Sequence, residues 1–235
     1  MKIVFLWIFD LIIEFFIALI TFFLSPIFAR SDLQWSLNKK QKPILLIHGY
    51  MHHSFVWFYH GKKLNEKGFG PIFTLNLKNT FNSINDHALA LDKKVNQILT
   101  KTKSKDLILI GHSMGGVIAS YYALNIAEKN TVSDVITIGS PLKGTIMARF
   151  GIGDSAKEMR SDSTFIKDLK EKIKNEKEIN FYHIATKTDQ LIIPYNSAVI
   201  GNKKHYIING LGHGALLYSR KVNDKISFWL SKILS

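Results

Sequence analysis

The residues best suited to chemistry form the run Gly111-His112-Ser113-Met114-Gly115-Gly116. It follows the apolar residues 107–110 and opens a segment, residues 117–127, that is predicted to be helical. A serine at such a strand–turn–helix junction sits in a strained turn that lifts its hydroxyl above the sheet edge, where it acts as a nucleophile. Glycines two residues to either side keep strand and helix from clashing. The alternative interpretation is an ordinary glycine-rich turn without a catalytic role.

A serine hydroxyl needs a base to accept its proton and an acid to orient that base. Asp189 follows the strand predicted at residues 181–186, and His213 follows the strand that ends at Ile208. We therefore predict Ser113 as nucleophile, His213 as base and Asp189 as orienting acid. Other carboxylates are less suitable candidates for the acid. Asp154, Asp162 and Asp168 lie in or after an irregular segment, and Asp134 precedes its strand and so lies at the wrong end of the sheet. Other histidines are less suitable candidates for the base. His183 lies inside a predicted strand, His205 lies at the start of one, and His112 is the direct neighbour of Ser113.

The run His48-Gly49-Tyr50 ends the first apolar strand. Its glycine allows the backbone to approach a reacting centre, and the next N–H can donate to an oxyanion. Tyr50 and Met114 are therefore the predicted oxyanion donors, while His48 is expected to support the loop by hydrogen bonding. A second histidine group, His52, His53 and His60, lacks the spacing of metal ligands, so we expect no metal.

The elements that must position these residues alternate along the chain. Apolar runs predict strands at residues 43–47, 71–75, 107–110, 132–138, 181–186 and 205–208. Helical spacing predicts helices at 56–67, 84–100, 117–127, 163–177 and 219–234, and residues 142–162 are irregular, which predicts a small or absent lid. Alternating strands and helices predict an α/β fold with a mostly parallel sheet flanked by helices on both faces.

Composition limits the possible classes of protein. Of 235 residues, 46% are hydrophobic and 21% are charged, which supports a folded core and excludes global disorder. The absence of cysteine excludes disulfides, thiolate metal sites and cysteine nucleophiles. The net charge of +13 favours contact with anionic lipid headgroups over nucleic acid, since no nucleic-acid-reading motif is present.

The first thirty residues differ from the rest. Residues 3–29 are apolar except at Asp10, Glu14, Thr21, Ser25 and Pro26, a length that can span a bilayer as a helix. We therefore predict three parts: a retained membrane anchor helix at 1–30, a polar linker at 31–42 and a catalytic domain at 43–235. A cleaved signal peptide and a buried amphipathic helix are the alternatives. The anchor predicts association with a bacterial inner membrane, and the basic residues after it favour the cytoplasmic side.

With these residues identified, the chain resembles the bacterial lipases and esterases of the α/β-hydrolase superfamily, in particular the compact Bacillus-type lipases. The likeness runs from about residue 43 to residue 235. It is carried by Ile47-His48-Gly49-Tyr50, Gly111-His112-Ser113-Met114-Gly115-Gly116, Thr137-Ile138-Gly139-Ser140-Pro141, Asp189 and Gly212-His213. The resemblance implies hydrolysis of carboxylic esters through an acyl-serine, without a cofactor. One departure is Leu142-Lys143-Gly144-Thr145, where such lipases often carry a histidine.

These features together predict a membrane-associated serine esterase or lipase that acts on lipid-like acyl esters. Aromatic residues beside the oxyanion loop, at positions 55 and 57–59, favour a lipid substrate, although they would equally suit a core. An acyltransferase or thioesterase would use the same three residues. A non-catalytic, membrane-tethered binding module would instead show a broken triad. The oligomeric state is left open.

Overall fold

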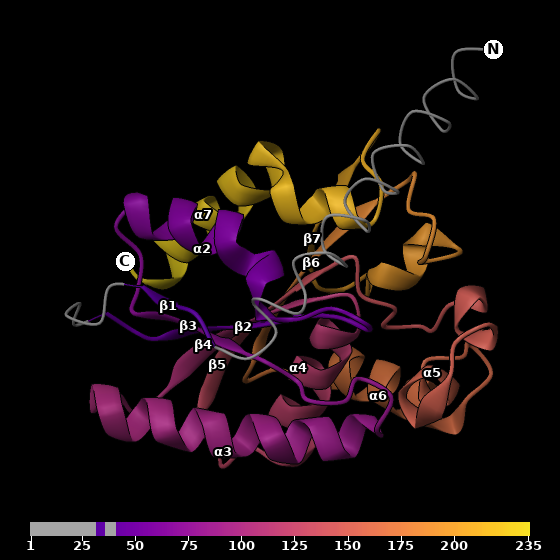
Figure 1. Cartoon of the computed structure of the whole chain (residues 1–235), viewed down its shortest axis with the longest axis horizontal. Helices are drawn as coiled ribbons and strands as arrows, with labels where there is room; N and C mark the ends of the chain where they lie inside the picture. Colours follow the sequence, from indigo (N-terminus) through magenta and orange to yellow (C-terminus); the bar gives the residue numbers. More distant parts are fainter. Residues whose placement is uncertain (1–31, 36–40) are drawn as a thin grey trace.

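The fold is built around a seven-stranded sheet, seen in a computed structural model that describes residues 32–35 and 41–235 (Figure 1). The strand order is β1-β3-β2-β4-β5-β6-β7. All neighbouring pairs are parallel except β1 with β3. The strands are β1 Gln34–Trp35, β2 Ile44–Ile47, β3 Ile72–Leu75, β4 Leu107–His112, β5 Val132–Ile138, β6 Asn180–Thr186 and β7 Lys204–Ile208. The predicted mostly parallel α/β sheet is therefore confirmed.

The central strands are apolar along their whole length because helices cover both faces of the sheet. Every residue of β2, β3 and β4 is buried. Helices α2 (Phe58–Glu66) and α7 (Arg220–Ile233) lie on one face, and α3 (Ile84–Thr102), α4 (Met114–Asn125) and α6 (Thr164–Asn175) lie on the other (Figure 1). The two larger hydrophobic clusters of the described residues lie one on each side of the sheet.

Serine caps define where three of these helices begin. The side chains of Ser83, Ser163 and Ser219 accept hydrogen bonds from the backbone N–H three residues later, at the starts of α3, α6 and α7. Such caps satisfy N–H groups that have no partner inside the helix. The boundaries predicted for these helices are therefore close to those observed.

Two regions are more ordered than the sequence predicts. The segment expected to be irregular contains a 3-10 turn, η2 (Ile146–Arg149), and a short helix, α5 (Gly153–Glu158). Gln34–Trp35, inside the predicted linker, pairs with β3. Three further 3-10 turns, η1 (Ser54–Trp57), η3 (Tyr195–Ala198) and η4 (Gly214–Tyr218), lie in loops between the main elements.

The expected membrane location requires correction. Across residues 32–35 and 41–235, no helix is both long enough and apolar enough to cross a bilayer. The anchor predicted at residues 1–30 lies outside the described residues. Because no described helix could cross a bilayer, the prediction of an inner-membrane location is withdrawn. The division into anchor, linker and domain stays a prediction.

Candidate active site

Four loops carry the predicted site residues to one edge of the sheet. Tyr50 follows β2, Ser113 follows β4, Asp189 follows β6 and His213 follows β7. Because these strands are parallel, their carboxyl ends share one edge, where ligand sites of open α/β sheets form.

Ser113 occupies a strained turn between β4 and α4. Its backbone angles are φ +55° and ψ −127°, a combination that L-residues rarely adopt. The Ser113 N–H donates to the Ile138 carbonyl at 2.9 Å, which ties the turn to β5. Helix α4 begins at the next residue, so the Met114 N–H belongs to the helix N-terminus.

The glycines of this turn are required by the close approach of backbone segments. A Cβ added at Gly111 would lie 2.3 Å from the Gly116 nitrogen. At Gly115 the added Cβ would lie 2.2 Å from the carbonyl oxygen of Ile47. Backbone atoms cannot move aside as flexible side chains do, so side chains at these positions would displace α4 from the sheet.

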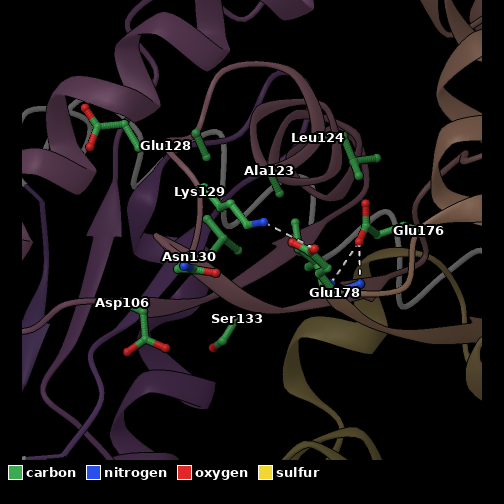
Figure 2. Close-up of a pocket in the computed structure, with 12 residues that line it drawn as sticks. Asp106, Ala123, Leu124, Glu128, Lys129, Asn130, Ser133, Glu176 and Glu178 are labelled. Carbon is green, nitrogen blue, oxygen red and sulfur yellow. Dashed lines mark hydrogen bonds and ion pairs between the residues drawn. The ribbon is translucent and has the colours of Figure 1, made fainter.

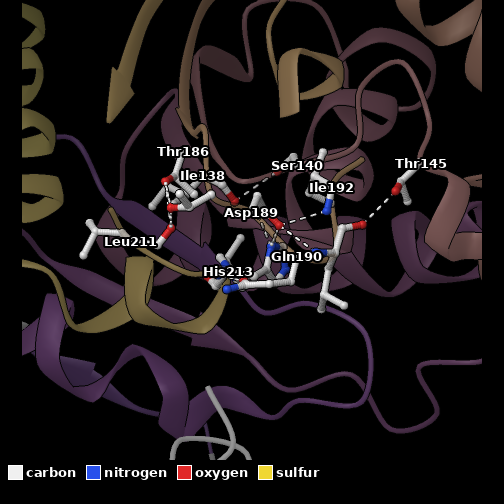
Figure 3. Close-up of polar contacts among 12 residues, drawn as sticks. Ile138, Ser140, Thr145, Thr186, Asp189, Gln190, Ile192, Leu211 and His213 are labelled. Carbon is white, nitrogen blue, oxygen red and sulfur yellow. Dashed lines mark hydrogen bonds and ion pairs between the residues drawn. The ribbon is translucent and has the colours of Figure 1, made fainter. Parts of the chain in front are cut away.

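His213 and Asp189 form a buried pair (Figure 3). The His213 Nδ1 lies 3.0 Å from both carboxylate oxygens of Asp189, and the two side chains are 3% and 2% exposed. Since a carboxylate only accepts hydrogen bonds, the contact places the proton on Nδ1 and the lone pair on Nε2. This is the tautomer that a general base requires.

The loop around Asp189 holds its carboxylate in place. Oδ1 accepts hydrogen bonds from the backbone N–H groups of Leu191 at 2.9 Å and Ile192 at 2.8 Å. The His213 N–H donates to the Gln190 side-chain oxygen at 3.1 Å (Figure 3). The loop that carries Asp189, residues 187–194, called the acid loop below, therefore also holds the loop that carries His213. Asp189 thus forms a local turn and contacts the histidine at the same time. Sequence reasoning missed Gln190, because only the folded loop brings it to His213.

The turn at Ser113 lies beside the pair formed by Asp189 and His213. His112, next to Ser113, donates from Nε2 to the His213 carbonyl at 3.1 Å, and the two rings are 4.7 Å apart. Burial, with the neighbouring His213, lowers the pKa of His112 well below its usual value, so its imidazole stays neutral. A Cβ at Gly139 would lie 3.3 Å from Asp189 Oδ2 and 3.4 Å from His213 Nδ1, which places the end of β5 against the pair.

The loop after β2, residues 48–53, carries the predicted oxyanion donor Tyr50 and is called the oxyanion loop below; it packs directly against Ser113. A Cβ at Gly49 would lie 2.7 Å from Ser113 Cβ and 3.3 Å from its hydroxyl oxygen. His48 holds this loop: its Nε2 accepts from the Leu77 N–H at 2.9 Å, and its Nδ1 donates to the Gly49 carbonyl at 2.9 Å. Burial lowers the pKa of His48 to about 3, so the ring is a neutral support.

The rival residues have other partners. Asp154, Asp162 and Asp168 form exposed ion pairs with Lys157, Arg149 and Lys172. Inside the sheet, His183 bonds through Nδ1 to the Thr137 hydroxyl at 2.9 Å, and burial lowers its pKa to about 3. None of these contacts leads to Ser113.

The histidines that suggested a metal cluster are separated. His60 bonds to the Leu216 carbonyl at 3.0 Å and to the Asn223 amide at 3.1 Å, between α2 and the C-terminal region. His52 instead stacks on His112 with ring centroids 6.0 Å apart. Among the described residues, no three His, Asp or Glu side chains are arranged to hold a metal ion.

Of the cavities formed by the described residues, two lie at opposite ends of the parallel strands. One, of about 430 Å³, is formed by the loops after β2 and β3, residues 51–53 and 76–81, beside the oxyanion loop. The other, of about 310 Å³, lies where β4 and β5 begin, and acidic side chains line it (Figure 2). Only the first cavity shares an edge with Ser113.

Comparisons with known proteins agree with this fold. The family model of the alpha/beta hydrolase fold matches residues 42–168. The chain is 40% identical over 75 residues to triacylglycerol lipase 2 of Saccharomyces cerevisiae, covering 30% of this chain and 23% of the yeast protein. It is 29% identical over 123 residues to the pimeloyl-(acyl-carrier protein) methyl ester esterase of Vibrio vulnificus, covering 51% and 45%. The matches thus span less than half of either relative.

Solved structures show the same architecture. The mature lipase BlEst2 of Bacillus licheniformis aligns with a TM-score of 0.72 at 14% identity, covering 87% of this chain and 98% of that one. Aspergillus fumigatus lipase B aligns with a TM-score of 0.71 at 16% identity, covering 83% and 53%. Because the family model covers more than half of the 235 residues, the chain belongs to the alpha/beta hydrolase fold family, and its similarities there are to lipases and esterases.

Proposed function

We propose that this chain is a serine hydrolase of carboxylic esters, with Ser113 as nucleophile, His213 as general base and Asp189 as the acid that orients His213. The buried contact of His213 Nδ1 with both Asp189 oxygens, beside a serine held at φ +55°, is the observation that supports this most strongly. The catalytic unit in this proposal is residues 43–235, with Gln34–Trp35 added to its sheet.

In the proposed reaction, His213 Nε2 accepts the hydroxyl proton as Ser113 Oγ attacks the ester carbonyl. The carbonyl oxygen becomes an oxyanion, which receives hydrogen bonds from the Tyr50 and Met114 N–H groups. His213 then gives its proton to the departing alcohol, leaving an acyl-serine. Water repeats the sequence, with His213 as base, and releases the acid and the free serine. The Asp189 carboxylate stabilises the imidazolium formed in each step.

Exposed apolar side chains around this edge favour esters with an apolar acyl group. They come from the oxyanion loop, the 146–152 segment and the acid loop: Met51, Ile146, Phe150, Ile152, Leu191 and Ile193, each more than a third exposed. The relatives named as a triacylglycerol lipase and a methyl ester esterase are consistent with an ester substrate.

The test is hydrolysis of p-nitrophenyl esters of graded acyl length by the purified chain, with Ser113→Ala as the matched control. We expect turnover and release of the free acid by the wild type, covalent labelling of Ser113 by a fluorophosphonate, and neither in the variant. Absence of both turnover and labelling in the folded wild type would refute the proposal. Transfer of the acyl group to an added alcohol, without acid release, would instead support an acyltransferase.

A further inference from the structure

The oxyanion loop contains a strained turn. The His52 N–H donates to the Gly49 carbonyl at 3.3 Å, closing a four-residue turn with Tyr50 and Met51 at its centre. Met51 has φ +55°, and turns with positive φ at this position prefer glycine because a Cβ is disfavoured there. A methionine at that position needs contacts from outside the turn to hold the conformation.

The phenol of Tyr50 supplies such a contact. Its hydroxyl donates to the Ile152 carbonyl at 2.7 Å and accepts from the Ile152 N–H at 2.9 Å. The ring also packs edge-on against Phe81, with centroids 5.4 Å apart. A second contact comes from Thr80, whose hydroxyl accepts the Met51 N–H at 3.1 Å. Both central residues of the turn are therefore held by hydroxyl groups.

Ile152 is a firm attachment point because its segment is tied down on both sides. After it, the Asp154 N–H donates to the Phe81 carbonyl at 2.9 Å, and the Ser155 hydroxyl donates to the Thr80 carbonyl at 2.8 Å. Before it, the Thr145 hydroxyl donates to the Leu191 carbonyl of the acid loop at 2.7 Å. Residues 145–155 thus form a strap that joins the acid loop to the oxyanion loop.

We propose that Tyr50 is a positioning residue whose phenol hydroxyl, held by Ile152 on the strap, keeps the Tyr50 backbone N–H aimed at the oxyanion. The proposal rests on the proposed function, since it assigns a second role, through the side chain, to a residue whose backbone N–H belongs to the same site. The oxyanion forms only after attack, so a misplaced N–H weakens binding of the transition state and leaves binding of the ester nearly unchanged. The expected signature is a fall in kcat at constant KM.

Tyr50→Phe tests this because it removes the hydroxyl and keeps the ring and the backbone N–H. Complete loss of an oxyanion donor costs roughly 10²–10³-fold in kcat, so a displaced donor should cost about 10-fold. We expect this loss at unchanged KM and by the same factor for short and long acyl esters. Tyr121→Phe is the matched control, since it also removes a hydrogen-bonded phenol hydroxyl, 3.2 Å from Asn85, and should keep wild-type kcat.

Met51→Gly gives an independent readout. Met51 is 69% exposed, and glycine adopts its positive φ without a penalty. If the hydroxyl acts by holding the turn, Met51→Gly should restore a large part of the kcat lost in Tyr50→Phe. A Tyr50→Phe enzyme with wild-type kcat, a change in KM alone, or no rescue by Met51→Gly would each overturn the proposal.

Two further measurements keep the test decisive. If circular dichroism shows that Tyr50→Phe does not fold, Ile152→Pro replaces it by removing the Ile152 N–H that donates to the Tyr50 hydroxyl. That variant should lose kcat at constant KM, and wild-type kcat would overturn the proposal. Fluorophosphonate labelling and ester turnover of the wild type are measured beside each variant. Their absence is a failure of the proposed function, whereas wild-type activity with unaffected variants is a failure of this inference alone.

Discussion

Replacing Asp189 by asparagine tests the proposed triad through the tautomer of His213. The Oδ1 position accepts two backbone N–H groups, at 2.9 and 2.8 Å. The asparagine oxygen must take that position, because an NH₂ group there would face two donors, at a cost of about 1–3 kcal/mol for each unsatisfied group. Its NH₂ then replaces Oδ2 and points at His213 Nδ1, 3.0 Å away.

An NH₂ group at that distance repels an N–H at Nδ1, whose other contact, Oδ1 at 3.0 Å, is already shared with two backbone donors. The substitution therefore favours the tautomer with the proton on Nε2, which cannot act as the base. We expect kcat to fall by roughly 10³–10⁴-fold, the scale of a triad carboxylate-to-amide change, or about 4–5.5 kcal/mol in activation free energy. The folded state should persist, because the two backbone N–H groups keep their acceptor.

The assay compares kcat for a p-nitrophenyl ester among the wild type, Asp189→Asn and Asp162→Asn. Asp162 pairs with Arg149 in an exposed contact, with side chains 61% and 60% exposed, so its change should leave kcat unaltered. A kcat for Asp189→Asn within a few-fold of the wild type would refute the assignment of the acid.

Three further predictions concern stability. Ser113→Gly should abolish turnover yet raise the free energy of unfolding by about 1 kcal/mol, because glycine relieves the strained φ of +55°; a lower melting temperature would contradict this. Gly115→Ala should lower that free energy by about 2–3 kcal/mol through its clash with the Ile47 carbonyl, whereas Gly201→Ala, with no atom within 4 Å, serves as the neutral control in the same urea titration. Burial lowers the pKa of several histidines, among them His48, His52, His60 and His183, so these four are neutral when folded and protonated when unfolded below pH 6.5. Stability measured by urea unfolding should therefore fall as the pH is lowered from 6.5 to 4, and a flat profile would refute this. Their pKa values are about 3 for His48 and His183 and about 4 for His52 and His60.

The core of the fold was predictable because its signals are local. Each central strand is an uninterrupted apolar run, and a buried parallel sheet requires such a run. The helix starts at Ser83, Ser163 and Ser219 are also local, because each serine side chain bonds to a backbone N–H only three residues later. The turn at Ser113 was readable for a related reason, since the glycines that prevent its clashes lie within three residues of it.

The choice of Asp189 and His213 depended on chain order as well as local pattern. Both follow late strands, and parallel strands bring such loops to one edge, so the topology predicted their meeting. The membrane location was wrong because it rested on hydrophobic length and basic charge in the sequence, neither of which establishes a spanning helix. No described helix meets the length and apolarity that crossing a bilayer demands.

The strap at residues 145–155 shows what sequence alone leaves open. It has little periodicity, and it is held by hydroxyl groups that bond to backbone atoms distant in the sequence, Tyr50 with Ile152 and Thr145 with Leu191. The sequence does not indicate which carbonyl group a given hydroxyl will bond. Only the folded sheet, which brings these segments together, determines the contacts. The same segment reaches both the acid loop and the oxyanion loop. In the proposed enzyme, a segment without a catalytic group is therefore hydrogen-bonded both to the loop of the orienting acid and to the loop of the oxyanion donor.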